Sequence, residues 1–157
     1  MKPTQKRGPA NGDFDFPQHC NIGVDCEDIQ RWREMVPKLA KEPLMKLFTP
    51  SEHKYCLSHN DPAPYYAARW CAKEALLKAI SPFCRLSLRD IEITRLKDGT
   101  PSFSLLTKRR IDVDIEAKLS IAHSDTSAVA VALVFVTKKT QVSEGTMAKR
   151  KFPGKGL

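Results

Sequence analysis

The stretch Asp61-Pro-Ala-Pro-Tyr-Tyr-Ala-Ala-Arg-Trp-Cys-Ala-Lys-Glu-Ala-Leu-Leu-Lys-Ala-Ile80 decides the fold of this chain. Asp61 is a favoured N-cap, the proline after it fits a first helical turn, and Ser81-Pro82 ends the pattern. Residues of high helix propensity fill the interior. The stretch therefore predicts one long helix, around which the rest of the chain is arranged.

Two sides of this helix are distinguished by a period of 3.6 residues. One side is an apolar stripe that predicts core contacts: Tyr66, Trp70, Leu77 and Ile80. The neighbouring side carries two small residues, then a carboxylate and an amine one turn apart: Ala67, Cys71, Glu74 and Lys78. On spacing alone, the last two are an ordinary i,i+4 ion pair on a solvated face, worth about 0.2–0.5 kcal/mol. A functional acid and amine are the alternative.

The length of 157 residues suits one domain with a single core. No apolar run reaches the roughly 18 residues that span a bilayer, and no apolar stretch follows the basic N-terminus as in a signal peptide. A cytoplasmic protein without a membrane partner is expected. The five cysteines are odd in number and form no C-x-x-C pair, which favours free thiols over a disulfide framework or a zinc site.

The net charge of +8 is concentrated at the C-terminal end, where residues 138–157 contain six Lys or Arg and one Glu. We expect a flexible N-terminal segment at 1–19, a folded domain at 20–137 and a basic, disordered tail at 138–157. A basic-tailed nucleic-acid binder is an alternative function. It is not favoured, because the body of the chain has no basic motif with interleaved aromatic residues.

A cluster of acids follows the first predicted strand, Cys20 to Cys26, in which Gly23 indicates close approach by a backbone or a ligand. Asp25 and Glu27 would project to the same side of an extended chain. Helix N-terminal charge accounts for Asp28 alone. Two carboxylates that project together repel unless a cation lies between them, and oxygen ligands suit Mg²⁺. A magnesium site and a plain helix start are both open on this segment.

The other elements predict an α+β domain, with helices first and an antiparallel meander later. Thr49-Pro-Ser-Glu52 is a capping box that opens a helix to about Ser58. Alternation on both sides of Asp98-Gly99 predicts a β-hairpin. The strand 118–124 places His123 on one face and Ser120 on the other, and 128–136 is a buried strand.

Taken together, these stretches resemble a 4′-phosphopantetheinyl transferase of the small, holo-acyl-carrier-protein-synthase type, over about residues 21–136. Five motifs in order carry the resemblance: Gly23-Val24-Asp25-x-Glu27 with Arg31 behind it, Phe48-Thr49-x-x-Glu52, Trp70-x-x-Lys73-Glu74-Ala75-x-x-Lys78, Gly99-x-Pro101, and Ser120-x-x-His123. The resemblance implies a long helix packed on a small antiparallel sheet. It also implies a homotrimer with its sites between subunits.

The implied activity is Mg²⁺-dependent transfer of 4′-phosphopantetheine from coenzyme A to a serine of an acidic acyl carrier protein, with release of 3′,5′-ADP. The resemblance implies these roles: catalysis by Glu74, Lys78 and Asp25; metal binding by Asp25, Glu27 and Glu74; coenzyme A binding by Lys73, Lys78, Ser120, His123, Gly99 and Pro101; and carrier contacts by Arg31 and Arg33. A carrier of fatty-acid synthesis and one of polyketide or peptide synthesis fit equally.

Two positions depart from the family pattern. Thr100 stands where the family has a phosphate-binding lysine between glycine and proline, and Ala122 stands where a serine or threonine would offer a second hydroxyl. These departures keep a second candidate open, a non-catalytic module of the same fold that binds carrier proteins.

Overall fold

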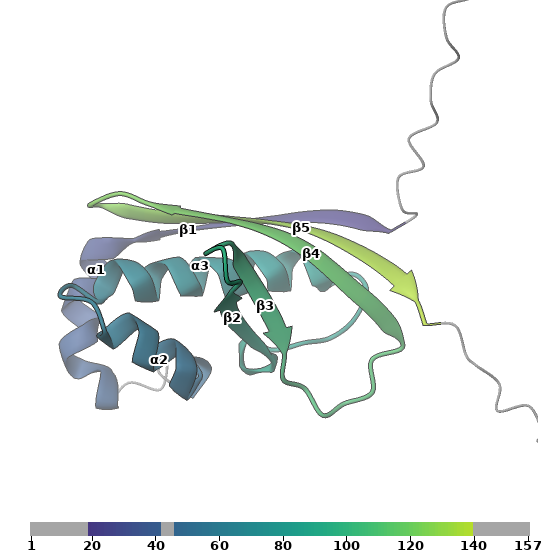
Figure 1. The fold of residues 1–157 in the computed structure, drawn as a ribbon, viewed down its shortest axis with the longest axis horizontal. Coiled ribbons are helices and arrows are strands. Elements are labelled where there is room, and N and C mark those ends of the chain that lie inside the picture. The colour runs from purple at the N-terminus through teal and green to yellow at the C-terminus, as the bar shows by residue number, and fades with distance from the viewer. Residues whose placement is uncertain (1–18, 42–45, 140–157) are drawn as a thin grey trace, which may run out of the picture.

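The computed structural model describes residues 19–41 and 46–139 (Figure 1). The expected flexible segment before Cys20 and the expected tail beyond Thr137 lie almost wholly outside these ranges. Among the described residues, no helix is both long and apolar enough to cross a membrane.

The domain is α+β, and its longest helix, α3 (Ala63–Ile80), packs along one face of a three-stranded antiparallel sheet (Figure 1). The strands of this sheet are β1 (Cys20–Asp28), β4 (Val113–His123) and β5 (Ser127–Lys138), in the order β1-β5-β4. A separate hairpin consists of β2 (Ile91–Arg95) and β3 (Pro101–Leu105). The remaining helices are α1 (Ile29–Met35), α2 (Pro50–Leu57) and the 3₁₀ turns η1 (Val36–Lys41) and η3 (Leu88–Asp90). The predicted fold class is confirmed, but the predicted meander is wrong, because the late strands belong to two sheets.

The helix α3 is buried on more sides than its predicted stripe. Tyr66 and Ile80 are fully buried, whereas Trp70 is only half-buried. The small residue Cys71 on the neighbouring side is also fully buried, and its thiol donates a hydrogen bond to the carbonyl oxygen of Ala128 on β5. The sheet covers the small residues, and α1, α2 and β2 contact other parts of the helix.

Gly23 allows β1 to cross α3 at backbone contact. A Cβ atom at this position would overlap the carbonyl oxygen of Ala75 and lie 2.9 Å from the amide nitrogen of Ala79. The predicted close approach at Gly23 is therefore confirmed, and the approaching group is the helix backbone. This contact brings the end of β1, with its acids, against the second half of α3.

The predicted cap of α2 and the predicted hairpin turn are present, but Asp61 is not the N-cap of α3, because Pro62 occupies that position; Asp61 accepts a 3.1 Å hydrogen bond from the amide of Ala63. Asp28 caps α1 by accepting a hydrogen bond from the amide of Gln30 at 2.7 Å. Thr49 and Glu52 form the reciprocal capping box of α2. Gly99 occupies the hairpin turn with a φ of 87°, a conformation that glycine adopts at little steric cost.

Candidate active site

The acidic end of β1 and the second half of α3 together form a charged site. Lys78 donates a 2.7 Å hydrogen bond to Oδ1 of Asp25 and a 3.1 Å hydrogen bond to the carbonyl oxygen of Val24. The Asp25 side chain is 14% exposed, and its Oδ2 is buried without a hydrogen-bond partner. Lys78 therefore pairs with Asp25 across two elements, and no ion pair between Glu74 and Lys78 is found within the described ranges. The simple i,i+4 interpretation is wrong.

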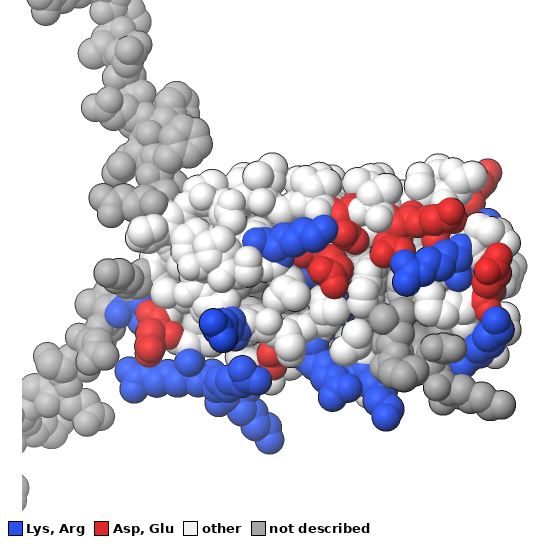
Figure 2. All heavy atoms as spheres, turned by 180° about the vertical axis from the view of Figure 1, so that it is seen from behind, with Lys and Arg blue, Asp and Glu red and all other residues white. Residues whose placement is uncertain are grey.

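Glu74 is the second carboxylate of this site. Its pKa is raised above 4.5, first by partial burial and then by the negative charge of Asp25, while Lys78 acts in the opposite direction. The pKa of Lys78 is also raised, chiefly by its hydrogen bond to Asp25. The two negative charges disfavour one another, and a cation or a proton would relieve this repulsion. Figure 2 shows acidic side chains gathered on this side of the molecule, with a basic side chain on either side of the group.

Glu27, predicted as the third metal ligand, is engaged elsewhere. Its Oε2 accepts hydrogen bonds from the indole nitrogen of Trp32 at 3.2 Å and from Arg31 at 3.3 Å. In the part of the chain that the structure describes, no three His, Cys, Asp or Glu side chains are arranged to hold a metal ion together. Asp25 and Glu74 are brought together, whereas the predicted trio is not assembled in a single chain.

The two arginines predicted to contact a carrier protein differ in their freedom. The side chain of Arg31 is 65% exposed, and among the described residues its one ion pair is with Glu27 near the end of β1. Arg33 is held at 3.0 Å by Asp61 and also donates to the carbonyl oxygen of Asp125 at 3.1 Å. It joins α1 to the start of α3 and to the β4–β5 turn, so Arg31 is the more accessible cation.

Lys73 lies away from the predicted coenzyme site. Its side chain is fully buried, with Nζ 2.8 Å from Glu52 Oε2, and it donates to the carbonyl oxygens of Leu47 and Leu88. An enclosed ammonium with these partners has no surface left for a phosphate. The prediction that Lys73 binds coenzyme A does not agree with this position, and we assign the residue a structural role.

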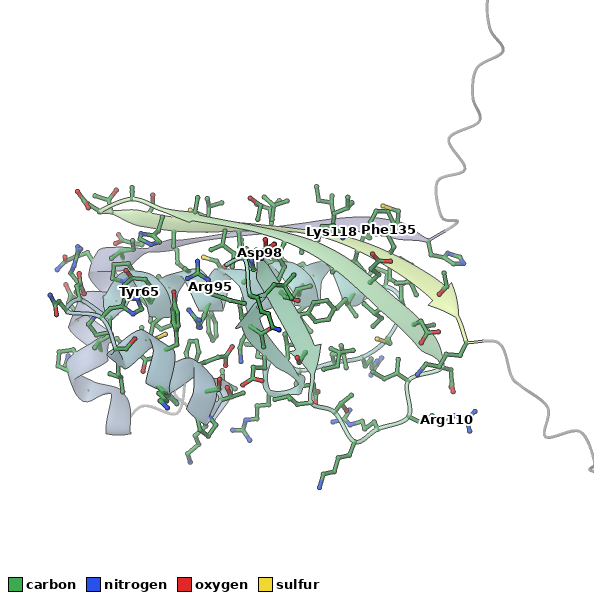
Figure 3. The ribbon with its side chains drawn as sticks, viewed as in Figure 1. Tyr65, Arg95, Asp98, Arg110, Lys118 and Phe135 are labelled. Atoms are coloured by element: carbon green, nitrogen blue, oxygen red, sulfur yellow. The ribbon has the colours of Figure 1, made fainter. Side chains whose placement is uncertain are left out.

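A second polar region lies around His123. A cavity of about 160 Å³ is lined by side chains from α2, α3, the β2–β3 hairpin and β4, among them Tyr55, Tyr65, Arg69, Arg95, Pro101 and His123. No carboxylate is among the lining residues. Figure 3 shows Tyr65 and Arg95 near one another on this side of the molecule. Guanidinium and aromatic groups without an acid favour an anionic ligand that carries a flat ring.

Arg69 is the most unusual residue of this cavity, and it was not predicted as a site residue. Arg69 is 7% exposed, its Nε is buried without a hydrogen-bond partner, and its guanidinium carbon lies 3.7 Å from the ring centre of Tyr55. An arginine within the alanine-rich part of a buried helix was the signal that could have identified it, since burying such a group is costly without a partner.

The predicted coenzyme ligands divide between this cavity and other surfaces. Pro101 lines the cavity and Gly99 shapes the turn beside it. Ser120 and His123 are both exposed, but they are three residues apart on one strand, so their side chains leave opposite faces of the sheet. The structure does not bring these two together.

The acidic site and the cavity at His123 are separate within one chain. β5 lies between β1 and β4, so the strands that carry Asp25 and His123 are two strand spacings, about 10 Å, apart. None of Asp25, Glu74 and Lys78 lines the cavity. A ligand that contacts both regions therefore has to meet them on two different copies of the chain, or to extend well beyond either one.

Residues 21–134 match the family model of the 4′-phosphopantetheinyl transferase superfamily. The chain is 33% identical over 116 residues to the holo-[acyl-carrier-protein] synthase of Thermodesulfovibrio yellowstonii, covering 74% of this chain and 96% of that protein. It is 38% identical over 118 residues to the holo-[acyl-carrier-protein] synthase of Moorella thermoacetica, covering 71% and 91%. Its fold resembles the crystal structure of Helicobacter pylori holo-[acyl-carrier-protein] synthase in complex with coenzyme A, with a TM-score of 0.59, 28% identity and coverage of 74% and 99%. With these motifs on this fold, the chain belongs to the 4′-phosphopantetheinyl transferase superfamily.

Proposed function

We propose that this protein is a holo-acyl-carrier-protein synthase of the cytoplasm. It transfers the 4′-phosphopantetheine group of coenzyme A to a serine of an acyl carrier protein and releases 3′,5′-ADP. The observation that carries the proposal is the site between β1 and α3, where Asp25, Glu74 and Lys78 combine two carboxylates with one amine. The synthases with which the chain shares up to 38% identity support the substrate class.

The oxygen donors at this site fit Mg²⁺. Asp25 Oδ2 is buried and unpartnered, and Glu74 lies close enough to sense the charge of Asp25. Mg²⁺ commonly takes one or two protein carboxylates and completes its octahedron with water and substrate phosphates. Asp25 and Glu74 would hold the ion, and Glu27 would join them after releasing Arg31 or Trp32. When bound, the ion polarises the phosphate oxygens and offsets the charge of the pyrophosphate.

Glu74 is the proposed general base. The serine oxygen of the carrier forms a bond to the β-phosphorus of coenzyme A, and the bond from that phosphorus to the bridging oxygen breaks. The serine proton passes to Glu74, directly or through a water that it orients, and the bridging oxygen leaves as part of 3′,5′-ADP. Partial burial and the charge of Asp25 raise the pKa of Glu74 in the metal-free chain, and a bound Mg²⁺ would act in the opposite direction, so Glu74 would act as a carboxylate when the ion is present.

Lys78 holds the phosphate side of the reaction. Its side chain is 51% exposed while its ammonium bonds Asp25, so it can also contact a phosphoryl oxygen. We propose that His123, Gly99 and Pro101 bind the coenzyme A phosphates from the cavity side, with Ser120 contacting them from its own face of the sheet. Arg31, and to a smaller extent Arg33, would meet the acidic surface of the carrier protein.

We also propose that the protein works as a homotrimer. The part of the sheet face opposite α3 that β1 and β5 form is apolar and uncovered in a single chain, with Ile22 60%, Val24 50% and Val129 37% exposed, whereas β4 adds the charged residues Asp114, Glu116 and Lys118 to the same face. An apolar face of this kind usually marks a protein contact. Packing these faces between copies would cover them, and it would allow the acidic site of one chain to approach the His123 cavity of the next.

The deciding experiment incubates the protein with coenzyme A, Mg²⁺ and an apo-acyl carrier protein, and measures the carrier mass. We expect the mass to rise by one phosphopantetheine group, with no rise after addition of EDTA or in the Asp25→Asn and Glu74→Gln variants. Carriers of fatty-acid synthesis and of polyketide or peptide synthesis should be offered in parallel. A folded protein that binds carrier but never modifies it would indicate the non-catalytic module instead.

A further inference from the structure

The carboxylate of Glu27 is engaged by two donors of different kinds. The indole nitrogen of Trp32 and a guanidinium nitrogen of Arg31 both donate to its Oε2, at 3.2 and 3.3 Å. Trp32 is 1% exposed and stacks on Tyr66, so its hydrogen bond belongs to the core. The side chain of Arg31 is 65% exposed, so its bond can be exchanged for a bond to a partner.

Glu27 nevertheless belongs to the same face of β1 as the acidic site. Asp25 lies opposite Ala130 in the sheet and Glu27 lies opposite Ala128, and both alanines are fully buried on the face that α3 covers. The pKa of Glu74 is raised first by partial burial, then by Asp25 and also by Glu27, so the charge of Glu27 reaches the site. Both donors use Oε2, and no hydrogen bond to Oε1 is found among the described residues.

Arg31 and a metal ion held by Asp25 and Glu74 therefore draw on the same negative charge. A guanidinium 3.3 Å from Oε2 offsets part of the charge that would attract a divalent cation. If Arg31 leaves, the carboxylate of Glu27 is free to contribute to the ion, directly or through a water. Trp32 still bonds Oε2, so Glu27 loses its counter-ion without losing its orientation.

We infer that Arg31 is a positioning residue that acts through Glu27: an acidic partner that binds Arg31 leaves Glu27 to the metal ion, so the partner and the ion bind cooperatively. This inference rests on the proposed function, which supplies the acyl carrier protein as the partner and Mg²⁺ as the ion. The coupling is reciprocal, because a carrier that raises the affinity for the ion is itself bound more tightly, by the same factor, when the ion is present. The factor should be about two- to fivefold, the range that release of one exposed ion pair supplies.

The first experiment measures the binding of Mn²⁺, which takes the same oxygen ligands as Mg²⁺, from the electron paramagnetic resonance signal of the free ion. Without a carrier, Arg31→Gln should bind Mn²⁺ about two- to fivefold more tightly than the wild type. Arg33→Gln is the matched control, because it removes an arginine of the same helix that Asp61 holds instead. At about 0.15 M salt, where charges are screened beyond about 8 Å, this control should bind Mn²⁺ as the wild type does.

The second experiment adds an apo-acyl carrier protein whose acceptor serine is replaced by alanine, so that no transfer takes place. A saturating amount of this carrier should raise the Mn²⁺ affinity of the wild type by about two- to fivefold. In Glu27→Gln, neither the carrier nor an added Arg31→Gln change should alter the Mn²⁺ affinity, because the carboxylate through which both act is gone.

The outcomes separate this inference from the proposed function. If Arg31→Gln leaves the Mn²⁺ affinity unchanged, or if Arg33→Gln raises it equally, Arg31 does not compete with the ion for Glu27. A carrier that shifts Mn²⁺ affinity as much in Glu27→Gln as in the wild type would also overturn the inference. In each of these cases, transfer that depends on Asp25 and Glu74 still stands. If the wild-type protein binds neither Mn²⁺ nor the carrier, both the inference and the proposed function are wrong.

Discussion

Lys73 and Glu52 form a fully buried ion pair, with 2.8 Å between Nζ and Oε2. Glu52 also accepts hydrogen bonds from the amides of Thr49 and Ile93, so this one carboxylate joins α2, α3 and the β2–β3 hairpin. Lys73 precedes the proposed base, Glu74, by one position. Two of the sequence motifs that carry the family resemblance are therefore physically coupled, and their shared task is to fix the rotation and position of α3.

The Lys73→Met variant should unfold more easily than the wild type, although Lys73 contacts no proposed ligand. It leaves the carboxylate of Glu52 buried without its cation, which typically costs about 3–5 kcal/mol. The double variant Glu52→Gln with Lys73→Met removes both charges and should recover part of that loss. Urea unfolding followed by circular dichroism measures both. A single variant as stable as the wild type would show that the pair adds nothing to the fold.

The elements predicted best from the sequence are those that depend on interactions between residues close together in the chain. The capping box at Thr49 and Glu52 and the turn at Gly99 each depend on residues within a few positions of one another, and all are present. The pairing of β1 with β5 was not predicted, because it joins strands about a hundred residues apart in the chain, from Cys20 paired with Phe135 to Asp28 paired with Ser127. Strand patterns show which face is apolar, but not which partner completes the sheet.

The site was predicted in part for the same reason. The family resemblance predicted that Asp25 lies near the helical turn that carries Glu74 and Lys78, and the geometry agrees with this prediction. Helical spacing alone paired Lys78 with Glu74, because a sequence shows which residues are neighbours on one helix but not which strand crosses that helix. The burial of Lys73 was missed because a lysine in a motif looks the same whether its partner is a phosphate or Glu52.

Gly23→Ala should destabilise the protein and damage the active site together. The added methyl group would meet the carbonyl oxygen of Ala75, which is backbone and cannot turn away. Overpacking of this kind costs about 1–3 kcal/mol or more, and relief requires β1 to move off α3. Such a shift would carry Asp25 away from Lys78, so transfer activity should fall in the fraction that remains folded. Urea unfolding and the carrier mass assay test the two effects separately, and unchanged activity would place the catalytic contact elsewhere.

The stability of the protein should depend on pH through Glu74. Its folded-state pKa is raised above 4.5, so the stability linked to this group is fully present below the pKa of the unfolded chain and is lost as pH rises through the folded-state pKa. Glu74→Gln removes the cost of the buried charge. The variant should melt above the wild type at pH 7 and equally at pH 4, while losing transfer activity about a hundredfold or more. A variant that melts below the wild type at pH 7 would contradict this assignment.

Val24→Asp should separate the copies without unfolding each one. Val24 is half exposed on the uncovered sheet face, where a carboxylate is readily solvated in a single chain but would be buried in an assembly. We expect light scattering to report a monomer and transfer activity to be lost. Leu57→Asp is the control, because Leu57 is 61% exposed on α2, away from that face. Equal dissociation by both changes would mean that the sheet face is not the contact.

The location of the site between copies can be tested by mixing two inactive variants. Asp25→Asn retains the His123 cavity, and His123→Ala retains the acidic site. Suppose that each active site takes its acids from one chain and His123 from the next. Random assembly then places an intact acidic site against an intact His123 cavity at one contact in four, so co-expression should return about a quarter of wild-type activity. If every site were built within one chain, the mixture would stay as inactive as either variant alone, and the strand order β1-β5-β4 would have to be spanned by the ligand itself.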